Sequence, residues 1–202
     1  MGYSTIIDIL GSMIIGGILL LILFRTNSSA VVNTYSFSGD INAQQSLSIV
    51  VQEIDMDFKK IGYTSNVNLI PDPTKVITYA DTLGIKFLSD LYNNGSVATI
   101  YYYLGPTSDM SYTPNPRDRI LYRVAPDNNG IISTLKNPGV TVFKFAYYDS
   151  SGVKLSCPVT IPNKIAKIQI SIKMESAEPY DSSYAGSYWT GTYRTMQNIM
   201  YR

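Results

Sequence analysis

Residues 1–24, MGYSTIIDILGSMIIGGILLLILF, form an apolar run in which Asp8 is the only charged side chain, and Arg25 ends it. The run is 24 residues long from Met1, but only 16 uncharged residues separate Asp8 from Arg25. Because a helix needs about 20 apolar residues to span a bilayer, it spans one only if Asp8 lies within the apolar layer. We therefore predict a helix over residues 1–25 that lies in a membrane or in the apolar core of a polymer.

Asp8 is the candidate functional residue of this helix. A carboxylate in an apolar helix is costly and is usually paired. No Lys or Arg lies within one helical turn of it. We therefore expect the counter-charge to come from elsewhere, and the N-terminal amine of an adjacent subunit is one candidate. The alternative is that Asp8 lies at the headgroup boundary and stays hydrated.

Small residues in the same run would let neighbouring helices approach closely, as they do in membrane helix pairs. The small and apolar residues that we expect to pack in a filament core are Gly11, Gly16, Gly17, Leu20 and Phe24. A secretory signal peptide begins with a basic region, and here no Lys or Arg precedes Arg25. The signal-peptide interpretation is therefore not favoured.

A second, amphipathic helical segment is predicted over residues 41–62. Between the two segments, Ser, Asn and Gly39 dilute the helical pattern, so we expect a weakened helix or a locally extended stretch there. Apolar residues then recur at three- and four-residue spacing, which is typical of one helix face. Those that we expect to pack against a sheet are Leu47, Val51, Ile54, Phe58 and Ile61. Lys59, Lys60 and Gly62 are typical helix-ending residues.

The remaining residues, 63–202, are predicted to form a β-rich head with a tyrosine-rich tail. The expected strands are residues 75–80, a hairpin over 85–104 around Asn93-Asn94-Gly95, and residues 120–125, 140–148 and 164–174. The alternation slips between Ile165 and Ile168, which predicts a bulge or a late strand start. No structure is assigned to residues 177–202. The predicted fold class is α+β, with a long helix whose C-terminal half packs on an antiparallel sheet.

Composition argues against several classes of function. There are 16 Lys and Arg against 15 Asp and Glu, so the net charge of +1 gives no basic footprint for nucleic acid. The chain has no histidine and one cysteine, Cys157, which removes the usual nucleophile arrangements and the commonest metal ligand. Asp90 and Asp127 precede turn sequences that lack the spacing of a calcium-binding EF-hand loop. We therefore expect no enzyme activity, no cofactor and no metal site.

Four segments, taken in order, resemble the type IV pilin superfamily, and more closely its J-type minor pseudopilins. They are the apolar helix with one acidic residue, DFKKIGY at 57–63, IKFLSDLYNNGSVATIYYYLG at 85–105 followed by RILYRV, and VTVFKFAYYDSSG at 140–152 followed by IAKIQISIKME. Together they cover roughly residues 1–175. Each is weak alone, and their order carries the resemblance.

The resemblance implies a structural subunit of an extracellular type IV pilus-like filament. Such a subunit is inserted in the inner membrane before assembly, is served by assembly machinery, and polymerises with copies of itself while its β head stays exposed. Asp8 would take the role of the acidic residue that pairs with a neighbour's N-terminal amine. A minor pseudopilin of a type II secretion system is the alternative within the family.

A single-pass membrane-anchored binding domain is the alternative from another class. The aromatic residues Trp189, Tyr184, Tyr188 and Tyr193 could form a platform for carbohydrate or peptide. This alternative predicts a monomer in detergent, whereas the family resemblance predicts a polymer.

Overall fold

The computed structural model describes residues 2–70, 72–127, 129–179 and 183–195. The chain divides into two units, residues 1–39 and residues 40–202. One helix, α1 (Gly2–Lys59), runs through the first unit and into the second.

The first unit is helical throughout its described residues, 2–39. The expected alternative of an extended stretch after Arg25 is therefore wrong. Ser and Asn lower helix propensity by only a few tenths of a kcal/mol each, and no proline interrupts the chain before Pro71. The hydroxyl groups of Thr26 and Thr34 also donate to the carbonyl groups of Ile22 and Ala30, one turn earlier, without breaking the helix.

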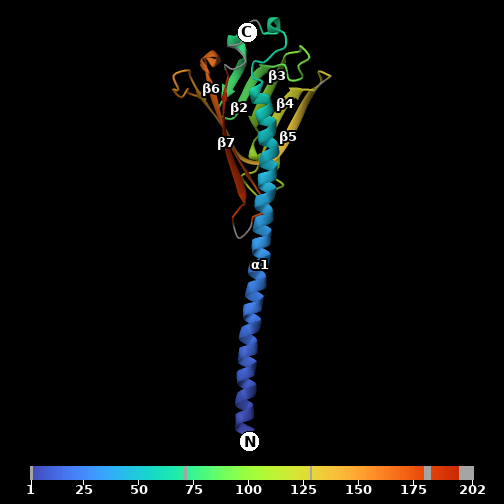
Figure 1. Ribbon diagram of the computed structural model, residues 1–202, viewed down its shortest axis with the longest axis vertical. Helices are drawn as coiled ribbons and strands as arrows, with labels where there is room; N and C mark the ends of the chain where they lie inside the picture. Colours follow the sequence, from blue (N-terminus) through green and yellow to red (C-terminus); the bar gives the residue numbers. More distant parts are fainter. Residues whose placement is uncertain (1, 71, 128, 180–182, 196–202) are drawn as a thin grey trace. The chain divides into compact units, whose positions relative to one another are not determined.

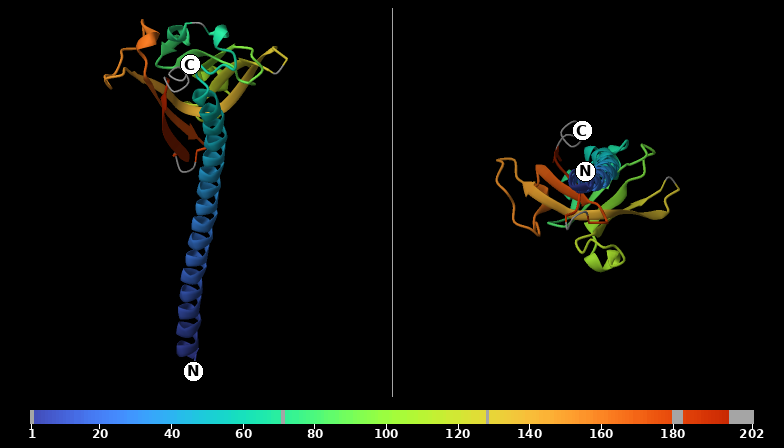
Figure 2. Two further views of the ribbon diagram at one scale, coloured as in Figure 1. Left: turned by 45° about the horizontal axis from the view of Figure 1, so that its top comes forward. Right: turned by 90° about the horizontal axis from the view of Figure 1, so that it is seen from below.

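The second unit contains an antiparallel sheet of seven strands in the order β1-β2-β3-β4-β5-β6-β7 (Figure 1). The strands are β1 (Ile77–Asp81), β2 (Gly84–Ser89), β3 (Ala98–Leu104), β4 (Arg119–Pro126), β5 (Ile132–Tyr148), β6 (Lys167–Glu175) and β7 (Gly186–Arg194). Every strand pairs with the next one along the chain. The sheet curls around the C-terminal half of α1, which lies against one of its faces (Figure 2).

The core of this unit lies between α1 and the sheet. Phe58 is buried, and its ring contacts the rings of Phe87, Tyr102, Phe145 and Tyr193 at centroid separations of 5.2 to 6.0 Å. One helical residue therefore touches strands β2, β3, β5 and β7. The predicted α+β fold, with the C-terminal half of the helix on an antiparallel sheet, is confirmed.

Several strand boundaries differ from those expected. Residues 73–75 form a 3₁₀ turn, so β1 starts at Ile77. For the strand expected at residues 164–174, the predicted late start is confirmed. A 3₁₀ turn at Pro162–Lys164 precedes this strand, β6, which begins at Lys167. β5 begins at Ile132, eight residues before the expected strand. Its pairing with β4 shifts register at Pro138 and Gly139 and then continues back to Ile132, so these residues do not end the strand.

The strand β7 lies in the tail to which no structure was assigned. Its side chains alternate, with Trp189 and Tyr193 turned to the inner face and Tyr188, Thr190 and Thr192 exposed. Most residues of this strand are polar or glycine, so the positions of the apolar residues alone do not show the alternation between the two faces. Gly191 has a packing role, because a Cβ at that position would lie 2.0 Å from Cη2 of Trp189.

Candidate functional site

The apolar surface of the first unit is the first candidate site. α1 is the one helix, among the residues searched, that is long and apolar enough to cross a membrane. The large apolar side chains of residues 6–24 are exposed, with Leu21 66% and Phe24 62% accessible. A continuous exposed apolar surface of this kind marks a site of membrane or protein contact.

The residues expected to mediate assembly lie on this open surface. Asp8 is exposed, and among the described residues no ion pair to its side chain is present. A Cβ added at Gly11, Gly16 or Gly17 would meet nothing within 4 Å. Leu20 and Phe24 are exposed as well. These residues are therefore accessible to another helix within the first unit as the structure describes it.

The residues expected to pack on the sheet lie in the core of the second unit. Leu47, Ile54, Phe58 and Ile61 are buried in one apolar cluster, and Val51 packs against that cluster while half-buried. Ile61 lies two residues beyond the end of α1, in the turn that leaves the helix.

An ionic network centred on the buried Asp57 also joins α1 to the sheet, and the sequence analysis did not identify it. Nε and Nη2 of Arg123 donate to Oδ2 and Oδ1 of Asp57 at 2.6 and 3.1 Å. The Tyr102 hydroxyl donates to Oδ2 of Asp57 at 2.6 Å. Glu53 completes the network, 3.4 Å from Arg123 Nε, and accepts a hydrogen bond from Asn137 at 3.2 Å. The network fixes both the position and the rotation of α1 on β3, β4 and β5.

Burial and charge shift the pKa values in this network in ways that hold it together. Burial lowers the pKa of Arg123, but its hydrogen bonds and charge interaction with Asp57 outweigh burial and raise the pKa overall. Burial and the Asp57 charge raise the pKa of Tyr102 well above its usual value. Burial also raises the pKa of Glu53, and this effect is larger than the lowering by the Arg123 charge. At neutral pH the phenol therefore remains a donor and the guanidinium remains charged.

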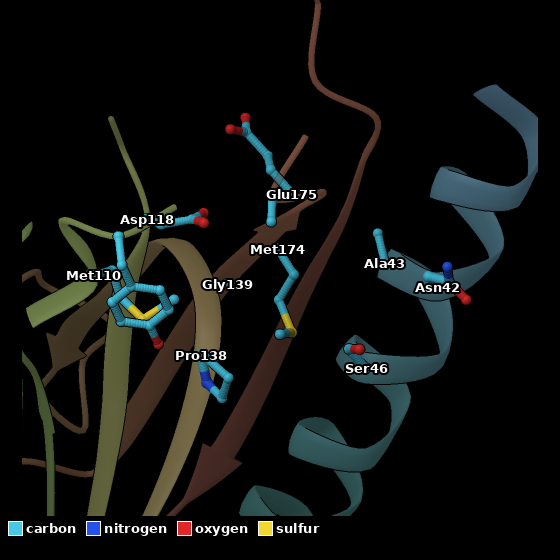
Figure 3. Close-up of a pocket in the computed structure, with 11 residues that line it drawn as sticks. Asn42, Ala43, Ser46, Met110, Asp118, Pro138, Gly139, Met174 and Glu175 are labelled. Carbon is cyan, nitrogen blue, oxygen red and sulfur yellow. The ribbon is translucent and has the colours of Figure 1, made fainter. Parts of the chain in front are cut away.

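A cavity of about 330 Å³ lies between α1, the middle of β5 at Pro138 and Gly139, and the C-terminal end of β6. Figure 3 shows Asp118 on one side of it and Ala43 and Ser46 of α1 on the other. Asp118 is 1% exposed, and neither of its carboxylate oxygens has a hydrogen-bond partner among the residues that the structure describes. Burial raises the pKa of Asp118, and the nearby charge of Glu175 adds to the rise. Burial in this cavity therefore disfavours the charged form of the Asp118 carboxyl group.

Glu175 lines the same cavity but is fully paired. Its Oε2 accepts from Nη2 of Arg117 at 2.8 Å and from Nδ2 of Asn115 at 3.1 Å, and its Oε1 lies 2.7 Å from Nζ of Lys173. Burial raises the pKa of Glu175, but these hydrogen bonds outweigh it and lower the pKa overall. The pKa values of these two neighbouring acids are therefore shifted in opposite directions.

The two loops that resembled calcium-binding sequences use their acids to order the turns. Asp90 accepts hydrogen bonds from the backbone amides of Asn94 and Gly95 and from the Ser65 hydroxyl. Oδ1 of Asp127 accepts from the amides of Asn129 and Ile131. Within the described residues no group of three or more acidic, His or Cys side chains could hold a metal ion.

The aromatic residues of the tail do not form one open platform. Trp189 is half-buried, with its indole ring lying over Gly191 of the same strand, and Tyr193 is buried against Phe58. Tyr188 lies on the opposite face, and the Tyr184 hydroxyl donates to the Pro114 carbonyl.

Comparison with known proteins gives no assignment, because no protein-family model and no curated protein matches this chain. The interpretation of function therefore depends on the geometry of the chain itself.

Proposed function

We propose that this protein is a structural subunit of a type IV pilus-like filament that polymerises through its apolar N-terminal helix and exposes its β head. The observation that carries the proposal is the exposed apolar surface of residues 6–24, on a helix whose later turns form part of the core of a β head. Such a surface requires apolar surroundings. A bilayer supplies them before assembly, and the same helix of neighbouring subunits supplies them afterwards.

Asp8 supports a polymer more than a simple membrane anchor. A carboxylate costs several kcal/mol in a hydrocarbon layer unless it is paired. In a helix that only anchors the protein in a membrane, the Asp8 carboxylate has no use. In a polymer, the same carboxylate can pair with the N-terminal amine of a neighbouring subunit. The open surface at Gly11, Gly16 and Gly17 would let that neighbour approach closely.

The proposal is tested by replacing Asp8 with Ala in the producing cell and measuring filaments in surface-sheared material by electron microscopy. We expect filament yield to fall at least tenfold, because removing one partner of a desolvated ion pair costs more than about 1.4 kcal/mol per subunit contact. Asp40→Ala is the matched control, since Asp40 lies on the same helix outside the apolar run. Asp8→Ala filaments at the yield of the control would reject the pairing role.

A membrane-anchored binding domain remains the competing proposal. It predicts that the detergent-solubilised protein is monomeric and that sheared material contains no filaments, with or without Asp8. The half-buried Trp189 and the buried Tyr193 give that proposal less support than the sequence offered.

A further inference from the structure

The sheet has one face that α1 does not cover, and the register of the strands shows which residues lie on it. Phe145 and Tyr193 contact Phe58 of α1, so they define the inner face. Side chains alternate along a strand, and directly paired residues share a face. The neighbours Lys144 on β5 and Arg194 on β7 therefore point to the outer face.

Cationic residues form a row across this outer face. Tyr148 pairs with Lys167 on β6, and Lys167 pairs with Arg194 on β7. On the other side of β5, Tyr148 is bridged to Lys154. Because neighbouring strands lie about 4.8 Å apart, the three cations and the tyrosine form one continuous row. Lys144 lies on the same face of β5, four residues before Tyr148.

These cations have no acidic partners in the described part of the chain. Lys144, Lys154, Lys167 and Arg194 are all exposed. None of the ion pairs found among the described residues includes any of them. Like charges placed directly opposite each other on a sheet, as Lys167 and Arg194 are, destabilise it. The arrangement therefore favours an anion supplied from outside the subunit.

Several acids of a second copy of the chain are poor sources of that anion, because they have partners within their own subunit. Asp57, Glu175 and Asp90 are buried with their own partners. Asp55 and Asp72 are paired with lysines on their own elements. An extended anionic polymer would match the row of cations better.

The groups around the row distinguish between kinds of anionic polymer. One edge of the row borders hydroxyl and amide side chains, those of Gln169, Ser171, Thr190 and Thr192, which share the outer face. Tyr148 offers little for stacking a nucleic-acid base, because Nζ of Lys167 lies 4.8 Å from the centre of its ring and its hydroxyl donates to Gln169. A polysaccharide that carries carboxylates next to its hydroxyl groups fits this surface, because the cations can contact the carboxylates while the hydroxyl and amide side chains bond to the sugar hydroxyls.

We propose that the outer face of β5, β6 and β7 binds an acidic polysaccharide, with Lys154, Lys167 and Arg194 contacting its carboxylates. Gln169, Thr190 and Thr192 donate to or accept from its hydroxyl groups. The site lies wholly within residues 40–202. It does not depend on polymerisation, so it can be tested whether or not the chain forms filaments.

The test uses the full chain in detergent micelles and measures binding to sodium alginate, a polyuronate, by biolayer interferometry, with neutral dextran as the uncharged polymer. We expect binding to alginate that weakens steeply between about 50 and 300 mM salt, because exposed charges are screened, and no binding to dextran. The double variant Lys167→Gln, Arg194→Gln should bind alginate about tenfold more weakly, from two exposed charge contacts.

Lys75→Gln is the matched control, because Lys75 is an exposed lysine paired with Asp72 outside this face. Equal loss of affinity in the control and the double variant would overturn the proposal, as would equal binding of dextran or no binding of alginate. A dT20 oligonucleotide is the second probe. Tighter binding of dT20 than of alginate, lost in the double variant, would assign the face to nucleic acid instead of polysaccharide.

Discussion

Replacing Phe58 with Ala tests the packing of the helix on the sheet most sharply. The Phe58 side chain is 1% exposed, and its ring contacts four other rings on four different strands. Truncating a buried Phe to Ala costs about 3 to 5 kcal/mol, more where the surroundings cannot collapse into the space. The four neighbouring rings are held by a continuous sheet, so we expect about 4 kcal/mol. For a unit of this size that loss lowers Tm by roughly 8 to 16 °C.

The assay is thermal unfolding of the full chain in detergent micelles, followed by the near-ultraviolet circular dichroism of the tyrosines. Ile49→Ala is the matched control, because Ile49 lies on the same helix with 66% of its side chain accessible. Exposed substitutions of this kind cost less than about 0.5 kcal/mol. A Tm for Phe58→Ala within 3 °C of the control, where at least roughly 8 °C is expected, would refute the packing argument.

Three further predictions concern the buried polar groups and β7. Asp57→Asn removes the charge that pairs with half-buried Arg123 and should lower the free energy of unfolding in urea by about 1.5 to 3 kcal/mol, whereas a loss below about 0.5 kcal/mol would show that the network contributes little to stability. Asp118 has a folded-state pKa that burial raises above 3.8, so its charge opposes folding increasingly as pH rises through that raised pKa. The variant Asp118→Asn does not titrate at this position, so its stability relative to the wild type should rise with pH from about 3.8 and level off above the raised pKa of Asp118, and a stability difference that stays constant with pH would contradict the assignment. Gly191→Ala would place a Cβ 2.0 Å from the Trp189 ring, so the indole should be displaced and its fluorescence should shift to the red; an unchanged emission spectrum would count against this close approach.

The sequence predicts those elements whose side-chain period is strong. The apolar face from Leu47 to Phe58 has helical spacing, and the hairpin around Asn93-Asn94-Gly95 has both alternation and a turn signal. The helix between residues 26 and 39 and the strand β7 were harder to predict. In the first, weak propensities are overridden by an unbroken hydrogen-bond ladder. In the second, Tyr188 and Trp189 are adjacent and three consecutive Thr and Gly residues follow them, so apolar periodicity is a poor guide.

The polar sites depend on contacts that are distant in sequence. Asp57 and Arg123 are 66 residues apart, so no local pattern could join them. A signal was nevertheless present, because Asp57 directly precedes Phe58 next to the apolar face of the helix, and Arg123 interrupts an apolar strand. A charge at a buried position implies a partner of opposite charge.

Net charge also hides how charge is distributed over the head. A total of +1 gives no basic footprint for nucleic acid, yet the outer face of β5 to β7 carries cations that have no acidic partner among the described residues. Strand register, which composition does not give, decides which side chains share a face.

The central claim is that the chain polymerises through the exposed apolar surface of α1. Electron microscopy of surface-sheared material from cells that produce the chain, with mass spectrometry of the purified filaments, tests it most directly. We predict filaments whose main component is this chain and whose yield falls in the Asp8→Ala variant. Recovery of the whole protein as a monomer in the detergent-solubilised membrane fraction, with no filaments containing it, would contradict the claim.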